Sequence, residues 1–133
     1  AIEQAQRIGH ALPVPDDFKV WVGSPRSAVG WLLHAAAMDT APMGLDRSLN
    51  LPGLCVTVGE MLAALEQVRP GAAGLVKRVA DPVIAEIVGG WPAAFTANRA
   101  KALGFAAHEA LVEVVRAFVA DDLEATRRER GMG

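Results

Sequence analysis

The stretch Phe18-Lys19-Val20-Trp21-Val22-Gly23-Ser24-Pro25-Arg26 decides the fold, because it passes directly from a strand pattern to a helix start. Its first part, residues 18–22, is β-branched and aromatic and alternates apolar side chains with Lys19 and Trp21, as a strand with one buried face does. Ser24 can accept a hydrogen bond from a free backbone N–H as an N-cap, and the proline after it suits the first helical position. The run predicts a strand followed at once by a helix.

The predicted helix runs to about Asp39 and is expected to bury one aliphatic stripe. Its apolar residues recur at the spacing of three, four and seven positions that shares one helical face. They are Val29, Leu32, Leu33 and Ala36. His34 lies on or beside this stripe, where a hydrogen-bonded histidine at the edge of the core is the ordinary outcome. We therefore expect the helix to pack on the domain through its aliphatic side chains.

Short strands and capped helices alternate along the rest of the chain. Thr57 and Glu60 have the spacing of a capping box, which predicts a helix to about residue 68. Further helices are expected at 82–88, around 98–101 and from about 108 to 123, and further strands at 48–51 and 75–79. The pattern predicts an α/β or α+β-like chain with a small sheet of few short strands and about four to five helices. The strands lie too far apart in sequence for a complete independent sheet to be expected.

Composition limits both the size and the partners of the protein. The chain has 133 residues, of which 52% are hydrophobic and 21% charged, enough for one small domain. Its 13 Lys and Arg against 15 Asp and Glu leave a net charge of −2, which gives no reason to expect a nucleic acid or an anionic membrane as partner. Cys55 is the one cysteine, which indicates a cytoplasmic protein, and with three scattered histidines it forms no metal site.

Two absences exclude whole classes of chemistry from this chain. It contains no tyrosine, so a phenolic acid or base cannot act here. It also lacks the glycine-rich loops that cradle a dinucleotide or a nucleoside triphosphate. We therefore expect no catalytic residue and no bound cofactor or metal in these residues.

Four side chains around the strand–helix junction are candidates for binding an anion: Lys19, Trp21, Ser24 and Arg26. A lysine beside an aromatic ring in a cleft can hold an anionic ligand, and free amides at a helix start, with an arginine, can hold a carboxylate or phosphate oxygen. The ordinary alternative is an edge-strand lysine, a half-buried indole, a helix cap and a solvated guanidinium. The residues alone leave both interpretations open.

Four segments, taken in order, resemble the carboxyl-terminal part of the extended short-chain dehydrogenase/reductase family, the NAD-dependent nucleotide-sugar epimerases and dehydratases. They are residues 19–36, 49–51, 56–61 and 98–105, the last reading Asn-Arg-Ala-Lys-Ala-Leu-Gly-Phe. Ser24-Pro25-Arg26 replaces the family's usual Val-Asp-Asp. With Asp81-Pro82 and Gly90-Trp91-Pro92, it is similar to the sugar-acid branch that D-erythronate dehydrogenase typifies. The resemblance covers residues 10–124 as a substrate-binding domain, with 1–9 as a tail or helix remnant and 125–133 as a polar tail.

This resemblance implies the substrate-binding part of an extended short-chain dehydrogenase fold without its Rossmann half, which carries the NAD loop and the catalytic Tyr-x-x-x-Lys pair. Lys19 stands where the family's strand arginine meets substrate anions, and Arg78 stands near a later arginine with the same role. Lysine cannot make the bidentate contact that arginine makes, so this position suits a smaller anion than a diphosphate.

The resemblance further implies a chain that is not catalytic by itself. Its partners would be a small sugar-acid-like anion and the missing Rossmann half, with NAD needed by the complete enzyme. The alternative is a stand-alone, non-enzymatic module that binds a small ligand or oligomerises. In that case a homo-oligomer would cover the apolar helices that the missing half leaves exposed.

Overall fold

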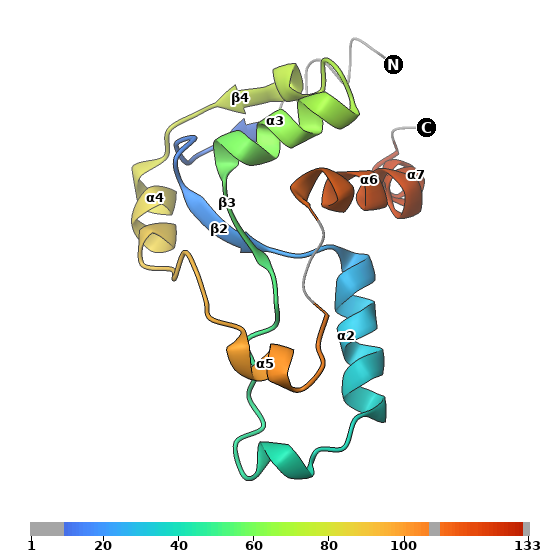
Figure 1. The fold of residues 1–133 in the computed structure, drawn as a ribbon. Helices are drawn as coiled ribbons and strands as arrows, with labels where there is room; N and C mark the ends of the chain where they lie inside the picture. Colours follow the sequence, from blue (N-terminus) through green and yellow to red (C-terminus); the bar gives the residue numbers. More distant parts are fainter. Residues whose placement is uncertain (1–9, 107–109, 132–133) are drawn as a thin grey trace.

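The computed structural model describes residues 10–106 and 110–131, and Figure 1 shows how their elements are arranged. The strands are β1 (His10–Leu12), β2 (Lys19–Val22), β3 (Leu54–Thr57) and β4 (Val76–Arg78). The helices are α2 (Pro25–Ala37), α3 (Val58–Val68), α4 (Pro82–Gly89), α5 (Asn98–Ala102), α6 (Leu111–Asp121) and α7 (Leu123–Glu129). Two 3-10 turns, η1 (Ala41–Met43) and η2 (Ala73–Leu75), complete the regular structure of the described residues. Few short strands among short helices confirm the predicted class.

The strands form two separate two-stranded sheets. β1 lies parallel to β4, with the register running from His10↔Val76 to Leu12↔Arg78. β2 lies antiparallel to β3, from Lys19↔Thr57 to Val22↔Leu54. Each pair joins segments far apart in sequence, so neither sheet is a hairpin. The expectation that the chain forms no complete sheet of its own is confirmed for the residues described.

Capping chemistry sets the helix starts that the sequence predicted. The Ser24 side chain accepts from the Ser27 backbone N–H at the start of α2. Thr57 Oγ1 accepts from the Glu60 backbone N–H at 3.1 Å, and the Glu60 carboxylate accepts from the Thr57 N–H at 2.7 Å, which completes the capping box of α3. Asp81 accepts from two backbone N–H groups in the first turn of α4.

The buried core is small and rich in alanine. The buried hydrophobic side chains of the described residues are Val56, Val58, Ala64, Ala97, Ala100, Phe105 and Ala117. α3 and α6 pack against each other, and each contributes one of these alanines. The chain exposes 9108 Å² of accessible surface, against about 6,700 Å² expected for a compact monomer of its mass.

The predicted strand at 48–51 is wrong, because strand structure begins only at Leu54. A hydrogen bond from β2 holds the backbone that precedes β3: the Trp21 indole N–H donates to the Leu51 carbonyl at 3.2 Å. A Cβ on Gly53 would lie 2.5 Å from Trp21 Nε1, so only glycine lets the backbone pass this close to the ring. The chain therefore passes the indole as irregular backbone before it pairs with β2.

The last predicted helix is divided in two, which raises the number of described helices above the expected four to five. α6 ends at Asp121, α7 begins at Leu123, and part of the polar segment expected as a tail is therefore helical. An ion pair between Glu124 and Arg127, one turn apart, lies along α7. The predicted start near residue 108, like the segment 1–9, lies outside the described residues.

The predicted inward face of α2 is wrong. Val29, Leu32 and Leu33 are 56%, 71% and 68% exposed, and Ala36 is exposed as well. The half-buried side of the helix carries Ser27, Trp31, His34 and Met38 instead. This second set also recurs at helical spacing, so periodicity alone could not choose between the two sides.

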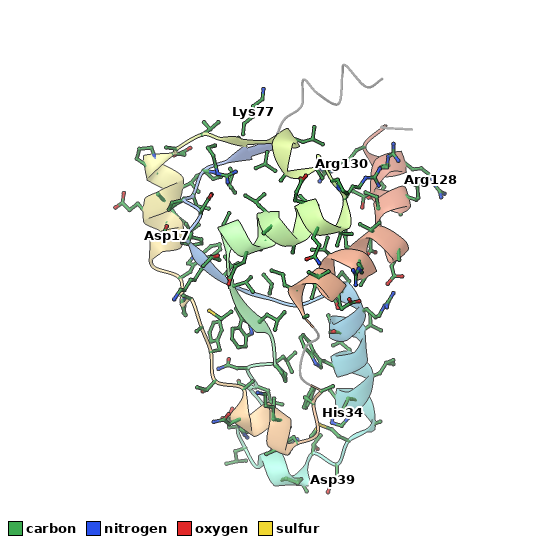
Figure 2. The ribbon with its side chains drawn as sticks, turned by 45° about the horizontal axis from the view of Figure 1, so that its top comes forward. Asp17, His34, Asp39, Lys77, Arg128 and Arg130 are labelled. Atoms are coloured by element: carbon green, nitrogen blue, oxygen red, sulfur yellow. The ribbon has the colours of Figure 1, made fainter. Side chains whose placement is uncertain are left out.

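Hydrogen bonds explain why the less aliphatic side faces inward. The Trp31 indole N–H donates to the Ala106 carbonyl at 3.0 Å, and His34 Nε2 lies 2.8 Å from the Leu103 carbonyl oxygen. The His34 ring also packs edge-on against Phe105. Figure 2 places His34 on the side of α2 that faces α5. These contacts attach α2 to the segment between α5 and α6.

Within the described part of the chain, no helix combines the length and the hydropathy that crossing a bilayer requires.

We expect Thr57→Ala to lower the free energy of unfolding by about 1 kcal/mol, because it removes the side-chain cap of α3. Urea denaturation measures the change. Thr40→Ala is the matched control, since Thr40 precedes η1 without a side-chain cap bond. Equal losses in the two variants would contradict the capping assignment.

Candidate functional site

A hollow of about 440 Å³ lies where β1 and β4 end beside the start of α4. Because the two strands are parallel, their carboxyl ends meet at one edge, and the chain leaving each strand forms a wall. One wall is 12–16, and the other is 78–82 with Ala85 of α4. Most of the lining is apolar. Its charged members are Asp16, Arg78 and Asp81.

Arg78 enters this hollow in a bidentate ion pair. Its Nε donates to Asp16 Oδ1 at 2.7 Å, and its Nη2 donates to Asp16 Oδ2 at 2.9 Å. Both side chains are about half exposed. Within the described residues, Nη1 of Arg78 has no hydrogen-bond acceptor, so this edge of the guanidinium remains able to donate to a ligand. Figure 2 shows the neighbouring Lys77 pointing away from the body of the molecule.

The Asp16 carboxyl titrates below its ordinary range because of this pair. The hydrogen bond from Arg78 is the largest cause of the lowered pKa, and the positive charge of Arg78 adds to it. The backbone carbonyl of Asp16 accepts from the Gly59 N–H at 2.8 Å, which ties the same residue to the first turn of α3. Asp16 thus links the hollow to the interior through its backbone and to Arg78 through its side chain.

Charge in the hollow does not favour a polyanion. Asp16 neutralises Arg78, and Asp81 adds a second carboxylate while it caps α4. Three of the lining residues are prolines, which have no backbone N–H to offer to a phosphate: Pro13, Pro15 and Pro82. The hollow therefore suits a small molecule with weakly polar surface and at most one negative group placed against Nη1 of Arg78.

The other predicted binding residues are not among those that line this hollow. Arg26 forms a bidentate pair with Asp121 of α6, with an Nε–Oδ2 distance of 3.0 Å. Ser24 is buried, 4% exposed, and caps α2. Trp21 donates to the Leu51 carbonyl and packs edge-on against Phe95.

Lys19 is exposed at the first position of β2. The structure therefore brings Arg78 to the hollow and places Lys19, Trp21, Ser24 and Arg26 elsewhere. A ligand contact by any of the five remains a prediction.

Sequence reasoning did not identify Asp16 as part of a site. It lies in an Asp-Asp pair that indicates a turn, and its pairing with Arg78 spans 62 positions of the chain. Only the parallel register of β1 and β4, which aligns Leu12 with Arg78, would have brought the two segments together. That register is a tertiary feature with no local sequence signal.

Arg99, at the start of α5, holds a loop. Its guanidinium donates to the Asp46 carboxylate and to the backbone carbonyls of Met43, Asp46 and Ser48. The pKa of Asp46 is lowered first by the Ser48 backbone N–H and then by the Arg99 charge. Arg99 thus closes the loop between α2 and β3.

In the described ranges, no group of three His, Cys, Asp or Glu side chains is arranged to hold a metal ion. Cys55 is exposed, and its thiol lies 3.2 Å from the Ala93 carbonyl oxygen as a weak donor. The thiol therefore contributes to packing between β3 and the segment before α5.

Comparison with known proteins gives two curated relatives, while no family model matches. The chain is 40% identical over 110 residues to a D-erythronate dehydrogenase of Cupriavidus necator, a match that covers 82% of this chain and 34% of that protein. It is 34% identical over 113 residues to a D-erythronate dehydrogenase of Haemophilus influenzae, covering 84% of this chain and 36% of that protein. The chain spans about a third of the length of the curated relatives it matches.

Two solved structures share the fold. The crystal structure of a nucleoside-diphosphate-sugar epimerase from Agrobacterium tumefaciens matches with a TM-score of 0.80 and 38% identity, covering 90% of this chain and 36% of that one. A partial consensus L-threonine 3-dehydrogenase matches with a TM-score of 0.73 and 20% identity, covering 90% of this chain and 39% of that one. The second likeness shows the fold alone. The expected resemblance to one part of a dehydrogenase and epimerase fold is confirmed.

We expect Arg78→Gln to return the pKa of Asp16 toward its ordinary value of 3.8, because the hydrogen bond and charge that lower it are removed. NMR titration of the carboxyl carbon measures the shift. Arg26→Gln, which breaks the comparable pair with Asp121, is the control and leaves Asp16 unchanged.

The same variant tests the pH dependence of stability. Because the pKa of Asp16 is lower in the folded state, its pair with Arg78 stabilises the fold at pH values above the ordinary pKa of the carboxyl. This stabilisation is lost as the pH falls through the folded-state pKa of Asp16. The urea midpoints of wild type and Arg78→Gln should therefore differ at neutral pH and converge in acid. A difference that persists in strong acid would contradict the ion-pair explanation.

Proposed function

We propose that this chain forms the substrate-binding part of a longer enzyme. It matches about one third of the length of two D-erythronate dehydrogenases and of a nucleoside-diphosphate-sugar epimerase. The complete enzyme would be an NAD-dependent member of the extended short-chain dehydrogenase/reductase family. Its substrate would be a sugar acid or a similar small anion. Residues 10–124 would form the substrate-binding domain, flanked by 1–9 and 125–133.

The observation that carries this proposal is the combined match of sequence and fold. The 38% identity to the epimerase comes with a TM-score of 0.80 over 90% of this chain, so nearly all of its fold is found inside a longer enzyme. The sequence lacks a tyrosine and a glycine-rich loop, so catalytic groups of that kind would have to come from the remainder. This chain would then bind and orient the substrate, and the rest of the enzyme would supply the catalytic groups.

The residues present do not fit NAD itself. The hollow offers three prolines where a pyrophosphate would need backbone N–H donors, and Asp81 already occupies the free amides at the start of α4. NAD would therefore belong to the rest of the enzyme, and this chain would meet only the substrate.

We assign the substrate's anionic group to the free Nη1 edge of Arg78. Asp16 fixes the guanidinium plane through Nε and Nη2, which leaves the Nη1 donors in a set direction. Lys19, an exposed point charge at the start of β2, does not line the hollow and would attract the anion only at longer range. Trp21, Ser24 and Arg26 would hold the strand and helix next to Lys19.

A stand-alone module is the second candidate, favoured by the exposed apolar side chains of α2 and α4. A homo-oligomer would cover them. Sedimentation across a dilution series separates the two functions: a stable closed dimer without affinity for D-erythronate favours the module.

We expect the isolated chain to show no NAD-dependent oxidation of D-erythronate. A hybrid in which this chain replaces the matching 110 residues of the Cupriavidus necator enzyme should oxidise it. Formation of NADH, followed by absorbance, measures both. Turnover by the isolated chain, or a folded hybrid without turnover, would contradict the proposed function.

In the hybrid, Arg78→Gln should raise KM for D-erythronate roughly tenfold or more, because a charge-assisted contact to the substrate is lost, while kcat changes less. Arg116→Gln is the control, since Arg116 pairs only with Glu113 on the exposed side of α6. A similar rise in KM for both variants would remove Arg78 from the substrate site.

A further inference from the structure

The hollow beside β1 and β4 carries more negative than positive charge. Its charged lining residues are Asp16, Arg78 and Asp81, so two carboxylates share the lining with one guanidinium. Lys77, the neighbouring cation in β4, points away from the body of the molecule in Figure 2. Asp81 is committed to α4, where its Oδ1 accepts from two backbone N–H groups of the first turn at 3.0 and 3.2 Å. Asp16 is therefore the carboxylate that determines how much of the positive charge of Arg78 a ligand can use.

The backbone of Asp16 is held in place. Its carbonyl oxygen accepts from the Gly59 N–H at 2.8 Å, and the Phe18 N–H donates to the Pro15 carbonyl at 3.1 Å, which closes a turn around Asp16. A Cβ on Gly59 would lie 3.3 Å from the Asp16 carbonyl oxygen, so glycine gives the start of α3 room for this close approach. The two-point contact with Arg78 then fixes the side chain. A ligand must therefore bind beside this carboxylate and not in its place.

We propose that Asp16 is the specificity-determining residue of the anion site and makes the hollow select an unphosphorylated sugar acid over its phosphate ester. This inference rests on the proposed function, which places the substrate's anionic group at Nη1 of Arg78. A carboxylate at that position brings one negative charge and accepts from the free donors of Nη1. A phosphate ester brings nearly two negative charges into the same hollow, beside the carboxylates of Asp16 and Asp81.

The selectivity follows from how repulsion and attraction depend on the charge of the ligand. Repulsion by the two fixed carboxylates grows in proportion to that charge. The number of free donors at Nη1 of Arg78 stays the same. Prolines at three lining positions leave fewer backbone N–H groups that could offset the extra charge. A group with one charge is therefore tolerated, and a group with two charges is rejected.

The test compares the affinities of the full 133-residue chain for D-erythronate and for its terminal phosphate ester, by NMR titration of the amide signals of 12–16 and 78–82. At neutral pH the wild type should bind D-erythronate more tightly than the ester by about tenfold or more. In Asp16→Asn this preference should shift toward the ester by about tenfold or more, because asparagine keeps the size of the side chain and one acceptor for Arg78 but removes the negative charge.

Asp46→Asn is the matched control. Asp46 is also an exposed carboxylate paired with an arginine, Arg99, but it does not line the hollow. The variant removes the same charge from the protein and should leave the preference between the two ligands unchanged.

Two further readouts separate charge selection from a merely structural role of Asp16. Asp16→Glu restores the negative charge, so it should restore the preference for D-erythronate. In the wild type, affinity for the ester should rise as the pH falls through the second pKa of the phosphate, about 6, because the ligand loses a charge. Asp16 stays ionised over that range, since Arg78 lowers the pKa of its carboxyl. The rise should be smaller in Asp16→Asn.

An unchanged preference in Asp16→Asn, or an equal shift in Asp46→Asn, would overturn the role of Asp16 and leave the proposed function standing. Binding of D-erythronate outside the hollow, or no binding, would overturn both the selectivity and the assignment of the substrate to Arg78. If Asp16→Asn does not fold, the wild type decides, because an affinity for the ester that does not rise on acidification would overturn the proposal. The expected preference in the chain, with a hybrid that does not oxidise D-erythronate, would retain the role of Asp16 and overturn the proposed function.

Discussion

The hydrogen bonds from Trp31 and His34 to the backbone between α5 and α6 are the constraint on which the shape of this protein depends. They attach α2, which contributes no fully buried residue, to a segment about 70 positions later in the chain. The Trp31 bond is exposed and the His34 bond is part-buried, and the His34 ring also packs against the buried Phe105, so these two rings face inward even though leucines share the helix. The aliphatic face of α2 is consequently exposed, and the molecule has an open side.

The hollow beside β1 and β4 results from a second constraint, the parallel pairing of two three-residue strands. That pairing brings together one segment with two prolines and one with a single proline, and these prolines reduce the number of backbone donors in the walls. One guanidinium edge is then the main polar feature available to a ligand. Such a site could orient a small anion. The open side and the hollow together agree with the proposal that this chain is part of an enzyme and positions substrate for groups held elsewhere.

The sequence predicted best where the determining interaction is local. Thr57 with Glu60, and Asp81 with the amides that follow it, set helix starts within four residues, and both were placed correctly. The inward face of α2 was predicted wrongly because two sets of side chains share the helical period, and the choice between them depends on carbonyl groups far along the chain. The prediction of a strand at 48–51 was wrong because contacts with Trp21 and the close approach at Gly53 determine the backbone there. Arg78 was singled out through resemblance, but its partner Asp16 has no local signal.

Side-chain oxidation by hydroxyl radicals, read by mass spectrometry, tests the orientation of α2 most directly. In the isolated chain Leu32 and Leu33 should be oxidised readily and Trp31 slowly relative to its high intrinsic reactivity, since the structure exposes the leucines and half buries the indole. In a longer enzyme that contains this chain, the two leucines should become protected while Trp31 changes little. Protection of Leu32 and Leu33 in the isolated chain, together with fast oxidation of Trp31, would contradict the account.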